Sequence, residues 1–471
     1  MMMMSQVADA LGTSLRGNDV LMTGVSKDTR DIHAGDLYVA LKGERFDGHK
    51  FIADAEAAGA VGALVSDIQS APLQSSQRSE MPQVLVEDTR IALGQLAAYW
   101  CRTWREQRAE SRLIGITGSN GKTSVKEMCS KVLTDFAGEE AVLATKGNLN
   151  NDIGMPMTLL ELRSQHRFAV IEMGANHVAE IDYLANIARP DVAVVNNVGP
   201  AHLQGFGSLE NIAAAKAEIF NGLSDDGVAI INQDDAFAPF WKDYCSGKST
   251  ITFSTLDKAA DVYAELLEDG GYRVVVKSGP GKTQQAILKL KVPGKHNVMN
   301  ALAVTAICIA LAIPLDDIMA SLSTFENING RLAMLDSSAG YKVIDDTYNA
   351  NPLSVSAAID VLAGMTGDTV LVLGDMAELG EQSEKMHAEI GSKAKYAGIS
   401  ALYATGVLSE NAVKAFGSNG FYYQSQDDLI AGLINNLTAD DVVLVKGSRS
   451  AAMERVVERI LTHENNNKRV N

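Results

Sequence analysis

The stretch "GITGSNGKTS", residues 115–124, decides the fold. Phosphate-binding loops commonly have the pattern G-x-x-x-x-G-K-[ST], but here Ile116 stands where that pattern has its first glycine. The shorter spacing can still form a cradle, because Gly118 and Gly121 let the backbone approach a phosphate and Lys122 adds positive charge. A plain strand-to-helix turn would need the two glycines but not the Lys-Thr pair. We therefore predict a phosphate-binding loop.

Secondary-structure signals flank this loop on both sides. Before it, "LIGIT" is an apolar run that predicts a strand. After it, apolar side chains recur with helical spacing and predict one buried face, formed by Val125, Met128, Cys129, Val132, Leu133 and Phe136. This order places the loop at a helix N-terminus, where anions bind.

Length and composition limit what the loop can belong to. The chain has 471 residues, too many for one hydrophobic core, and we expect three domains, at residues 1–110, 111–326 and 327–471. With 46% hydrophobic and 21% charged residues, the composition is that of a soluble globular protein. A net charge of −17 argues against nucleic acid as a partner, since neutralising phosphates needs a basic surface. A local cluster of donors must therefore bind any anionic ligand.

The cysteines and the apolar segments indicate a reducing compartment. The four cysteines lack C-x-x-C spacing, which suggests neither a disulfide framework nor a thiolate metal site. The start "MMMMSQVADALG" has no basic region and too short an apolar run for a secretory signal. Residues 301–315, "ALAVTAICIALAIPL", are too short to span a membrane and predict a buried helix. We expect a cytoplasmic protein without membrane insertion.

Strands and helices alternate in the first two predicted domains. In the first, residues 37–41 and 61–65 are predicted strands around a helix that ends at Gly59, and residues 69–80 are a loop by composition. The central part alternates as a mostly parallel sheet requires. Near its end, the period-two runs "YRVVVKSG" and "AILKLKV" predict a small antiparallel flap.

A third alternating unit follows. Four runs, "YKVIDD", "TVLVLGD", "ALYATG" and "DVVLVKG", predict strands that end at polar or glycine positions. Open α/β sheets bind ligands at these ends. The tail "HENNNKRVN" is expected to be disordered.

Two residues near the loop suggest a metal site. The strand "RFAVIE" ends in Glu172, and a strand-terminal acid can share Mg²⁺ with Thr123, although it can also be a solvated strand end. His202 follows the predicted strand 192–196, where a histidine is more often structural or a cap than a ligand.

Lys216 lies on an unexpected face of a predicted helix, residues 208–220. The inward stripe of this helix contains Lys216 together with Leu209, Ile212, Ala213 and Phe220. Burial would lower the pKa of the amine and make it reactive, whereas periodicity alone favours a side chain that extends to solvent. Glu172, His202 and Lys216 leave successive elements on the loop's side of the sheet, which is hard to assign to packing.

Taken in order, the motifs of the chain resemble those of the Mur ligases, nearly from end to end. They are "TGSNGKTS", "GNLNNDIGMP", "IEMGANHVAEI", "NNVGPAHLQGFGSLENIAAAKAEIF", "PGKHNVMNALA", "GRLAML", "VIDDTYNANP", "VLGDMAELG" and "KGSRSAAME". The resemblance implies an α/β fold with a small N-terminal UDP-binding domain, a central ATPase domain with a P-loop-type, mostly parallel sheet, and a C-terminal Rossmann-like domain. It also implies ATP-dependent amide synthesis through an acyl phosphate.

The resemblance further assigns the nucleotide and metal residues, with ATP and Mg²⁺ as cofactors. ATP is expected at Gly118, Ser119, Asn120, Gly121, Lys122, Thr123, Ser124, Asn297, Asn300, Arg331 and Asp346. Asn297 could instead cap the helix that follows it. Thr123 and Glu172 would serve a first Mg²⁺, and His202 and Lys216 a second. Lys216 would be carbamylated by CO₂, since a carbamate offers an anionic oxygen where an ammonium would repel the metal. The catalytic set implied is Lys122, Lys216, His202 and Arg331.

The resemblance is greatest to the branch that adds D-alanyl-D-alanine to UDP-N-acetylmuramoyl-tripeptide in peptidoglycan synthesis. It implies small-molecule substrates, and we expect a monomer. The UDP-muramyl-peptide is expected at Thr29, Arg30, Lys42, Gly43, Asp47, Gly48, His49, Asn150 and Asn151, although residues 42–49 also suit a solvated hairpin. Asn349 is the candidate dipeptide contact, whereas Asn351 precedes Pro352 and a helical stripe, which predicts an N-cap.

Other classes of protein fit the sequence less well. Another amino-acid-adding member of the family remains the nearest alternative, but no "DNPR" occurs in the chain, which argues against the members that add diaminopimelate. The "DTR" and "KGERFDGH" elements argue against a folylpolyglutamate synthase-like ligase. A P-loop GTPase would need an [NT]-K-x-D element, which the sequence lacks. A non-catalytic ATP sensor would not need an inward lysine and a histidine beside the phosphates.

Overall fold

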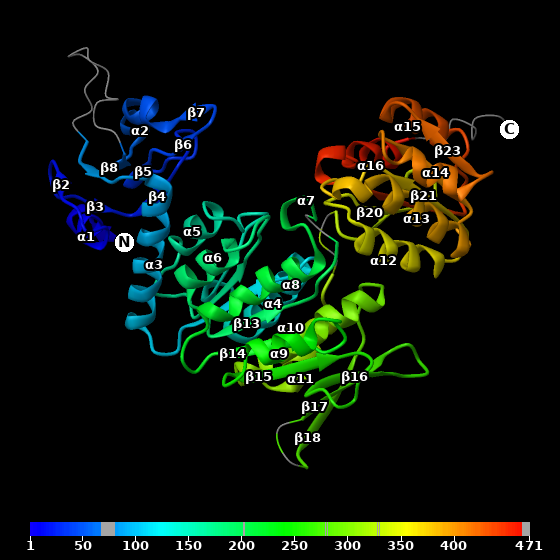
Figure 1. Ribbon diagram of the computed structural model, residues 1–471, viewed down its shortest axis with the longest axis horizontal. Coiled ribbons are helices and arrows are strands. Elements are labelled where there is room, and N and C mark those ends of the chain that lie inside the picture. The colour runs from blue at the N-terminus through cyan, green and yellow to red at the C-terminus, as the bar shows by residue number, and fades with distance from the viewer. Residues whose placement is uncertain are drawn as a thin grey trace.

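The computed structural model describes residues 1–66, 81–200, 203–277, 279, 281–326, 328 and 330–463. Three α/β units follow one another along the chain, and the central unit lies between the N-terminal and the C-terminal unit (Figure 1). The predicted loop at 69–80, His202 and the tail at 464–471 lie outside the described residues.

The N-terminal unit is built on a five-stranded sheet in the order β2-β9-β8-β5-β4. Strands β4, β5, β8 and β9 are parallel, and the edge strand β2 is antiparallel to β9. The helix α2 ends where Gly59 adopts a φ of 110°, a left-handed conformation that glycine allows at a helix end. The elements are β1 (Met2–Met3), α1 (Met4–Ala10), β2 (Leu15–Arg16), β3 (Leu21–Met22), β4 (Gly24–Ser26), β5 (Asp36–Val39), β6 (Lys42–Gly43), β7 (Phe46–Asp47), α2 (Ile52–Ala58), β8 (Gly62–Val65) and β9 (Gln83–Leu85).

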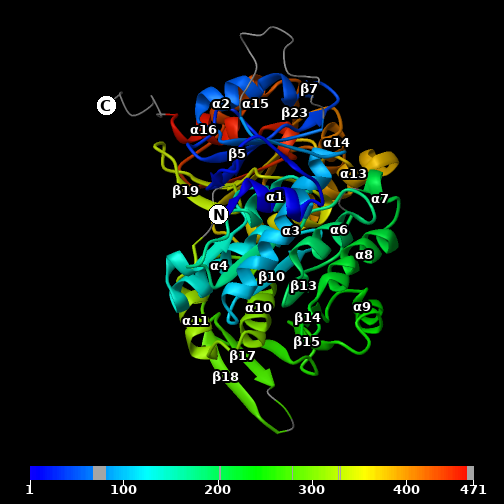
Figure 2. The ribbon, with the colours of Figure 1, turned by 90° about the vertical axis from the view of Figure 1, so that its left-hand side faces the viewer.

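The long helix α3 (Thr89–Gln107) leads from this sheet to the central unit (Figures 1 and 2). It packs against the helices α5 and α6 of the central unit. Two indole groups fix it there, because Trp100 donates to the carbonyl of Leu162 and Trp104 to that of His166, each at 3.0 Å. The helix thus joins the two units through a shared apolar core.

The central unit has a nine-stranded sheet in the order β11-β12-β10-β13-β14-β15-β16-β17-β18. The first seven strands are parallel, and helices cover both faces, with α4, α10 and α11 on one side and α3, α6 and α8 on the other. The elements are β10 (Arg112–Thr117), α4 (Lys122–Ala137), β11 (Val142–Ala144), α5 (Gly154–Leu159), β12 (Phe168–Glu172), α6 (Glu180–Ala188), β13 (Val192–Val195), α7 (Leu203–Phe206), α8 (Leu209–Ala217), β14 (Val228–Asn232), α9 (Ala238–Tyr244), β15 (Ser249–Ser254), β16 (Val262–Leu266), β17 (Tyr272–Lys277), β18 (Thr283–Leu288), α10 (Lys295–Ala310) and α11 (Leu315–Ser323).

The predicted antiparallel flap is present as β16, β17 and β18, but its last strand begins earlier than expected. The register pairs Tyr272 with Leu288 and Lys277 with Thr283, so β18 starts directly after the hairpin and ends at Leu288. The alternation in "AILKLKV" therefore marks only part of the strand and continues beyond its end.

The C-terminal unit has a six-stranded sheet in the order β19-β20-β24-β21-β22-β23, parallel except for β19. The four predicted strands are β20, β21, β22 and β24, and the edge strands β19 and β23 were not predicted. The elements are β19 (Ala333–Asp336), β20 (Lys342–Asp346), α12 (Pro352–Ala363), β21 (Asp368–Leu373), α13 (Ser383–Tyr396), β22 (Ala401–Thr405), α14 (Glu410–Phe416), β23 (Gly420–Tyr423), α15 (Gln426–Ile434), β24 (Asp441–Lys446) and α16 (Glu454–Leu461).

The predicted apolar helix faces are buried except near helix ends. Phe136, in the last turn of α4, and Leu209, the first residue of α8, were expected to face inward but are exposed. The predicted helix 208–220 divides into α8 and a 3₁₀ turn at Glu218–Gly222. The apolar segment at 301–315 lies largely in the buried helix α10, as predicted. No helix in the part of the chain that the structure describes has the length and hydropathy to cross a bilayer.

Candidate active site

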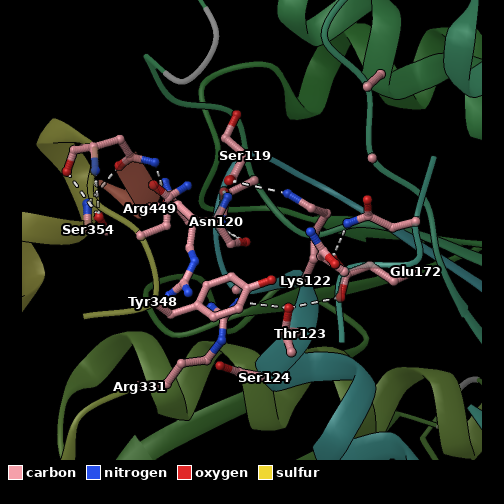
Figure 3. Close-up of a pocket in the computed structure, with 18 of the residues that line it drawn as sticks. Ser119, Asn120, Lys122, Thr123, Ser124, Glu172, Arg331, Tyr348, Ser354 and Arg449 are labelled. Carbon is pink, nitrogen blue, oxygen red and sulfur yellow. Dashed lines mark hydrogen bonds between the residues drawn. The ribbon is translucent and has the colours of Figure 1, made fainter. Parts of the chain in front are cut away.

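One cavity of about 1490 Å³ lies between the central and C-terminal units, with the start of α3 also in its lining. Its lining includes Arg90 from α3, Lys122 and Glu172 from the central unit, and Arg331 and Asn349 from the C-terminal unit. Figure 3 shows side chains of the central and C-terminal units pointing toward one another across this space. The parallel strands β10 and β12 end beside it, as the sequence predicted for a ligand site.

The glycines of the loop are required by both conformation and space. Gly118 and Gly121 have φ values of 148° and 76°, where a side chain causes strain. A Cβ on Gly121 would lie 2.5 Å from the amide oxygen of Asn300 and 2.6 Å from the amide nitrogen of Asn196. The loop can therefore pass between α4 and these asparagines only with glycine at residue 121.

Lys122 is the first residue of α4 and folds back over the loop (Figure 3). Its Nζ donates to the carbonyl of Gly118 at 2.8 Å and to that of Ser119 at 3.5 Å. Burial lowers the pKa of Lys122, and the Glu172 carboxylate opposes this shift. The ammonium thus lies beside the loop, where a bound phosphate would meet it.

Thr123 joins the loop to two charged residues (Figure 3). Its hydroxyl donates to Oε2 of Glu172 at 2.9 Å and accepts from Nη2 of Arg331 at 2.8 Å. The other carboxylate oxygen of Glu172 accepts from Nδ2 of Asn150 at 2.7 Å. A hydroxyl and a buried carboxylate therefore lie together at the start of α4, and hard oxygen donors of this kind suit Mg²⁺.

Arg331 reaches the loop from the C-terminal unit. Its guanidinium lies 4.1 Å from the ring centroid of Tyr348, so the aromatic face holds it in place (Figure 3). This contact orients the positive charge toward Thr123. The resemblance to the Mur ligases assigns Arg331 to the ATP site, and the structure brings it to the same loop as Lys122.

Lys216 is buried, with 2% of its surface exposed, and does not extend to solvent. Its Nζ lies 5.5 Å from the ring centroid of Phe206. The pKa of Lys216 is lowered to about 7, mainly by burial and also by the ammonium of Lys122. The carboxylates of Glu180 and Glu218 oppose this shift. An amine with this pKa is largely neutral just above pH 7, which is the form that reacts with electrophiles.

The metal set predicted from the sequence is described in part. Thr123 and Glu172 line the cavity, whereas Lys216 is not among its lining residues and is linked to the loop through the charge of Lys122. His202 lies outside the described residues. Among the residues that the structure describes, no group of three or more His, Cys, Asp or Glu side chains could hold a metal ion. A metal at Thr123 and Glu172 would thus take its other ligands from water and phosphate, as Mg²⁺ commonly does.

Asn297 and Asn300, which the resemblance assigns to the ATP site, form a short chain of amides at the start of α10. Asn297 lies within the helix, because the N-cap is Gly294, and its Nδ2 donates to the carbonyl of Pro293 at 2.7 Å. Asn300 donates to the side-chain oxygen of Asn297 at 3.3 Å. Both asparagines are buried and line the cavity, so the alternative role of Asn297 as an N-cap is wrong.

Asp346 forms a buried ion pair with Lys446, at 2.6 Å. Burial raises the pKa of Asp346, and the ammonium of Lys446 opposes this shift. Lys446 also donates to the carbonyl of Asn349 at 2.8 Å. The pair thus ties the end of β24 to the end of β20, and both residues line the cavity.

The remaining predicted residues fall into two groups. Ser119, Asn120, Ser124, Asn150, Asn151 and Asn349 line the cavity, whereas Thr29, Arg30, Lys42, Gly43, Asp47, Gly48 and His49 do not. The second group lies in the N-terminal unit, where Arg30 is exposed and pairs with Asp28, and Lys42 and Gly43 lie in an exposed hairpin.

His49 is buried with both ring nitrogens engaged. Nδ1 lies 2.7 Å from the Asp47 carboxylate, and Nε2 accepts from the backbone N–H of Ser66 at 2.9 Å. These bonds fix the end of the hairpin and leave the ring no free nitrogen for a ligand. His49 therefore acts on this loop by holding its shape.

Four residues of the site were not predicted: Asn196, Asn197, Tyr348 and Lys446. Asn196 and Asn197 follow the apolar strand β13, and both donate to the backbone carbonyl of Asn120. Two polar residues directly after "VAVV", and a lysine directly after "VVLV", are the signals that could have found them, since parallel strands end at ligand sites.

The fold and the cavity define a multidomain protein of the P-loop class, with a nucleotide loop on one domain and an arginine supplied by another. Three family models match the chain: the Mur ligase family catalytic domain at residues 21–100, the Mur ligase middle domain at 116–308, and the Mur ligase glutamate ligase domain at 330–449. The chain belongs to the Mur ligase family.

Relatives of known name and structure narrow this assignment. The chain is 41% identical to the UDP-N-acetylmuramoyl-tripeptide–D-alanyl-D-alanine ligase of Escherichia coli (strain K12), over 97% of this chain and 98% of that protein. A crystal structure of MurF from Acinetobacter baumannii matches with a TM-score of 0.85 at 36% identity, over 97% of this chain and 98% of that one. MurF from Thermotoga maritima in complex with ADP matches with a TM-score of 0.78 at 27% identity, over 93% and 97%.

Proposed function

We propose that this protein uses ATP to join D-alanyl-D-alanine to UDP-N-acetylmuramoyl-tripeptide, releasing ADP and phosphate. The observation that carries the proposal is the meeting of Thr123, Glu172 and Arg331 in one cavity that the central and C-terminal units and the start of α3 line. The names of the relatives support this choice of substrates. The structure of the Thermotoga relative with ADP supports the nucleotide.

The chemistry explains why positive charge gathers in an acidic protein. The terminal carboxylate of the tripeptide attacks the γ-phosphorus of ATP, and the bond from phosphorus to the bridging oxygen breaks, giving an acyl phosphate and ADP. The amine of the dipeptide then attacks the acyl carbon, and the tetrahedral intermediate expels phosphate with loss of a proton from nitrogen. Lys122 and Arg331 balance the charge of the two anions that meet in the first step.

The metal residues are assigned by their donor chemistry. Thr123 and Glu172 would hold Mg²⁺ at the β- and γ-phosphates, and Lys216 and His202 would hold a second ion. When bound, these ions neutralise phosphate charge and polarise the transferred group. Lys216 enters this set as a carbamate: its neutral amine adds to CO₂ and loses a proton, which leaves an anionic oxygen ligand in place of a cation.

The substrates divide among three domains, at residues 1–110, 111–326 and 327–471. The uridine nucleotide binds the N-terminal domain at the hairpin that carries Lys42 and Asp47. Asn150 and Asn151 face the muramyl peptide, and Asn349 contacts the dipeptide. This division explains the large central cavity, because the acceptor and the acid come from opposite sides and meet at the nucleotide loop.

One assay tests the proposal. UDP-muramyl-tripeptide with ¹⁸O in its terminal carboxyl is incubated with ATP, Mg²⁺ and either D-alanyl-D-alanine or single amino acids, and the products are identified by mass. We expect pentapeptide only with the dipeptide, and one ¹⁸O in the released phosphate. Equal use of single amino acids would refute the acceptor, and unlabelled phosphate would refute the acyl-phosphate route.

A further inference from the structure

A chain of hydrogen bonds between asparagines runs from the C-terminal unit, through the phosphate loop, to the helix α10. Nδ2 of Asn351 donates to Oδ1 of Asn120 at 2.7 Å. The backbone carbonyl of Asn120 accepts from Nδ2 of Asn196 at 3.0 Å, and the same Nδ2 lies 2.9 Å from Oδ1 of Asn300. Four asparagines thus connect α12, the phosphate loop and α10, with Asn351 and Asn196 as the donors and Asn120 and Asn300 as the acceptors.

Asn120 is held on its other side as well. Its backbone N–H donates to Oδ1 of Asn197 at 2.8 Å, so this N–H is directed away from any phosphate. Its backbone carbonyl also accepts from Nδ2 of Asn197 at 3.1 Å. The backbone of Asn120 is therefore fixed by the central unit, and its side-chain oxygen alone is directed to the C-terminal unit.

Asn351 does two things at once. Its Oδ1 accepts from the backbone N–H of Ser354 at 2.9 Å and caps α12, while its Nδ2 reaches across to Asn120. The prediction of an N-cap at this residue was correct but covered only the first of these roles. Beside it, Leu353 packs closely on the backbone of Gly199 in the central unit. The space is so narrow that a Cβ on Gly199 would lie 2.1 Å from Cδ1 of Leu353.

We propose that Asn351 is a positioning residue for the ligase reaction, acting through Asn120 to set the C-terminal unit against the phosphate loop. The start of α12 carries the wall of the cavity next to Asn349, so a shift of α12 moves the dipeptide side relative to the phosphates. Asn351 is buried, with 8% of its surface exposed, so water competes little for this bond. The inference rests on the proposed function for its choice of substrate.

The test separates the two roles of Asn351. Asn351→Ser keeps a good N-cap but is too short to reach Asn120. Ser354→Ala is the matched control, because it removes the reciprocal side-chain bond of the cap and leaves the Asn120 contact intact. Each variant is measured for melting temperature, for ADP affinity by calorimetry, and for kcat and KM with D-alanyl-D-alanine.

We expect kcat/KM for the dipeptide to fall about three- to tenfold in Asn351→Ser, the effect of one lost neutral hydrogen bond. Melting temperature and ADP affinity should stay close to those of the unchanged protein, and Ser354→Ala should keep its dipeptide parameters. In the double variant with Asn120→Ala, Asn351→Ser should cause no further loss. Unchanged dipeptide parameters in Asn351→Ser, or losses that multiply in the double variant, would overturn the proposal.

A second measurement does not depend on the substrate. Small-angle scattering should give a larger radius of gyration for Asn351→Ser than for Ser354→Ala, because the C-terminal unit loses a tie to the loop. Equal radii would overturn the positioning role even if the protein had another acceptor. Dipeptide-independent activity in the unchanged protein, by contrast, would refute the proposed function and leave the scattering result to decide this inference.

Discussion

Replacing Lys216 by alanine tests the site most directly. The proposal requires a neutral amine, and the structure supplies one: at a pKa of about 7, about three-quarters of the amine is neutral at pH 7.5, against about 0.1% at the ordinary value of 10.5. Carbamate formation is therefore favoured by a factor of several hundred over an exposed lysine. Lys216→Ala removes the anionic ligand, and we expect activity to fall about 100-fold or more, as when one transition-state contact is lost.

The missing side chain leaves a buried space that a small carboxylate can fill. Acetate or formate should therefore restore part of the activity of Lys216→Ala, since either supplies an anionic oxygen. In the unchanged protein, ¹³C-bicarbonate should give a carbamate resonance that weakens as the pH falls below 7. The sign follows from the pKa, because acid converts the reactive amine into an ammonium.

A second buried lysine provides the control. Lys126, on α4, is also 2% exposed, but its Nζ donates to the carbonyl of Thr145 at 2.8 Å and pairs with Glu127, so its amine is already bound by two oxygen acceptors. Lys126→Ala should not be rescued by carboxylates and should keep the ¹³C signal. Full activity of Lys216→Ala without added carboxylate, or a ¹³C signal that survives the substitution, would refute the carbamate.

Three further predictions test other parts of the molecule. Gly121→Ala should weaken ADP binding at least about tenfold in calorimetry, because its Cβ has no space at a φ of 76°, whereas Gly138→Ala, at 93° in open surroundings, should bind ADP normally. Lys446→Met should lower the free energy of unfolding by about 3–5 kcal/mol in denaturant titrations, since it leaves the Asp346 carboxylate buried without its cation. Asp346→Asn should restore most of this loss, and the loss should shrink at acid pH, because the raised pKa of Asp346 lets it bind a proton in the folded state; equal losses in the single and double variants would contradict the argument. His49→Ala should raise KM for the UDP-linked substrate several-fold with little change in kcat, because it releases the hairpin from the Ser66 N–H, and an unchanged KM would show that the hairpin does not need it.

Periodicity and motif spacing predicted the architecture well. The strand before the loop, the helix α4 and the four central C-terminal strands follow from apolar runs bounded by glycine or polar residues. The errors lie at ends and edges: Phe136 and Leu209 continue an inward stripe in sequence but occupy helix ends, where the chain leaves the core. The strands β19 and β23 lie at sheet edges and carry weaker patterns.

The site was predictable where a residue type is unusual for its place. A Lys-Thr pair after glycines and a lysine on an apolar helix face are such cases. The structure places Lys122 and Thr123 at the loop, and it buries Lys216 within the electrostatic influence of Lys122. The contact between Asn120 and Asn351 gives no such signal, because each looks like an ordinary loop or cap residue until the fold brings them together. Contacts between residues 120 and 351 depend on how two units meet, which no local pattern records.

The hydroxyl of Thr123 already forms two hydrogen bonds, one to the carboxylate of Glu172 and one from the guanidinium of Arg331. A divalent ion at the second lone pair of that oxygen would lie close to the guanidinium, and repulsion between the two cations would push the arginine away. The displaced guanidinium would then be free to follow the transferred phosphate. Entry of the nucleotide and its ion would thus be coupled to the release of Arg331. The positive charge needed for the reaction would already lie at the loop before the nucleotide binds.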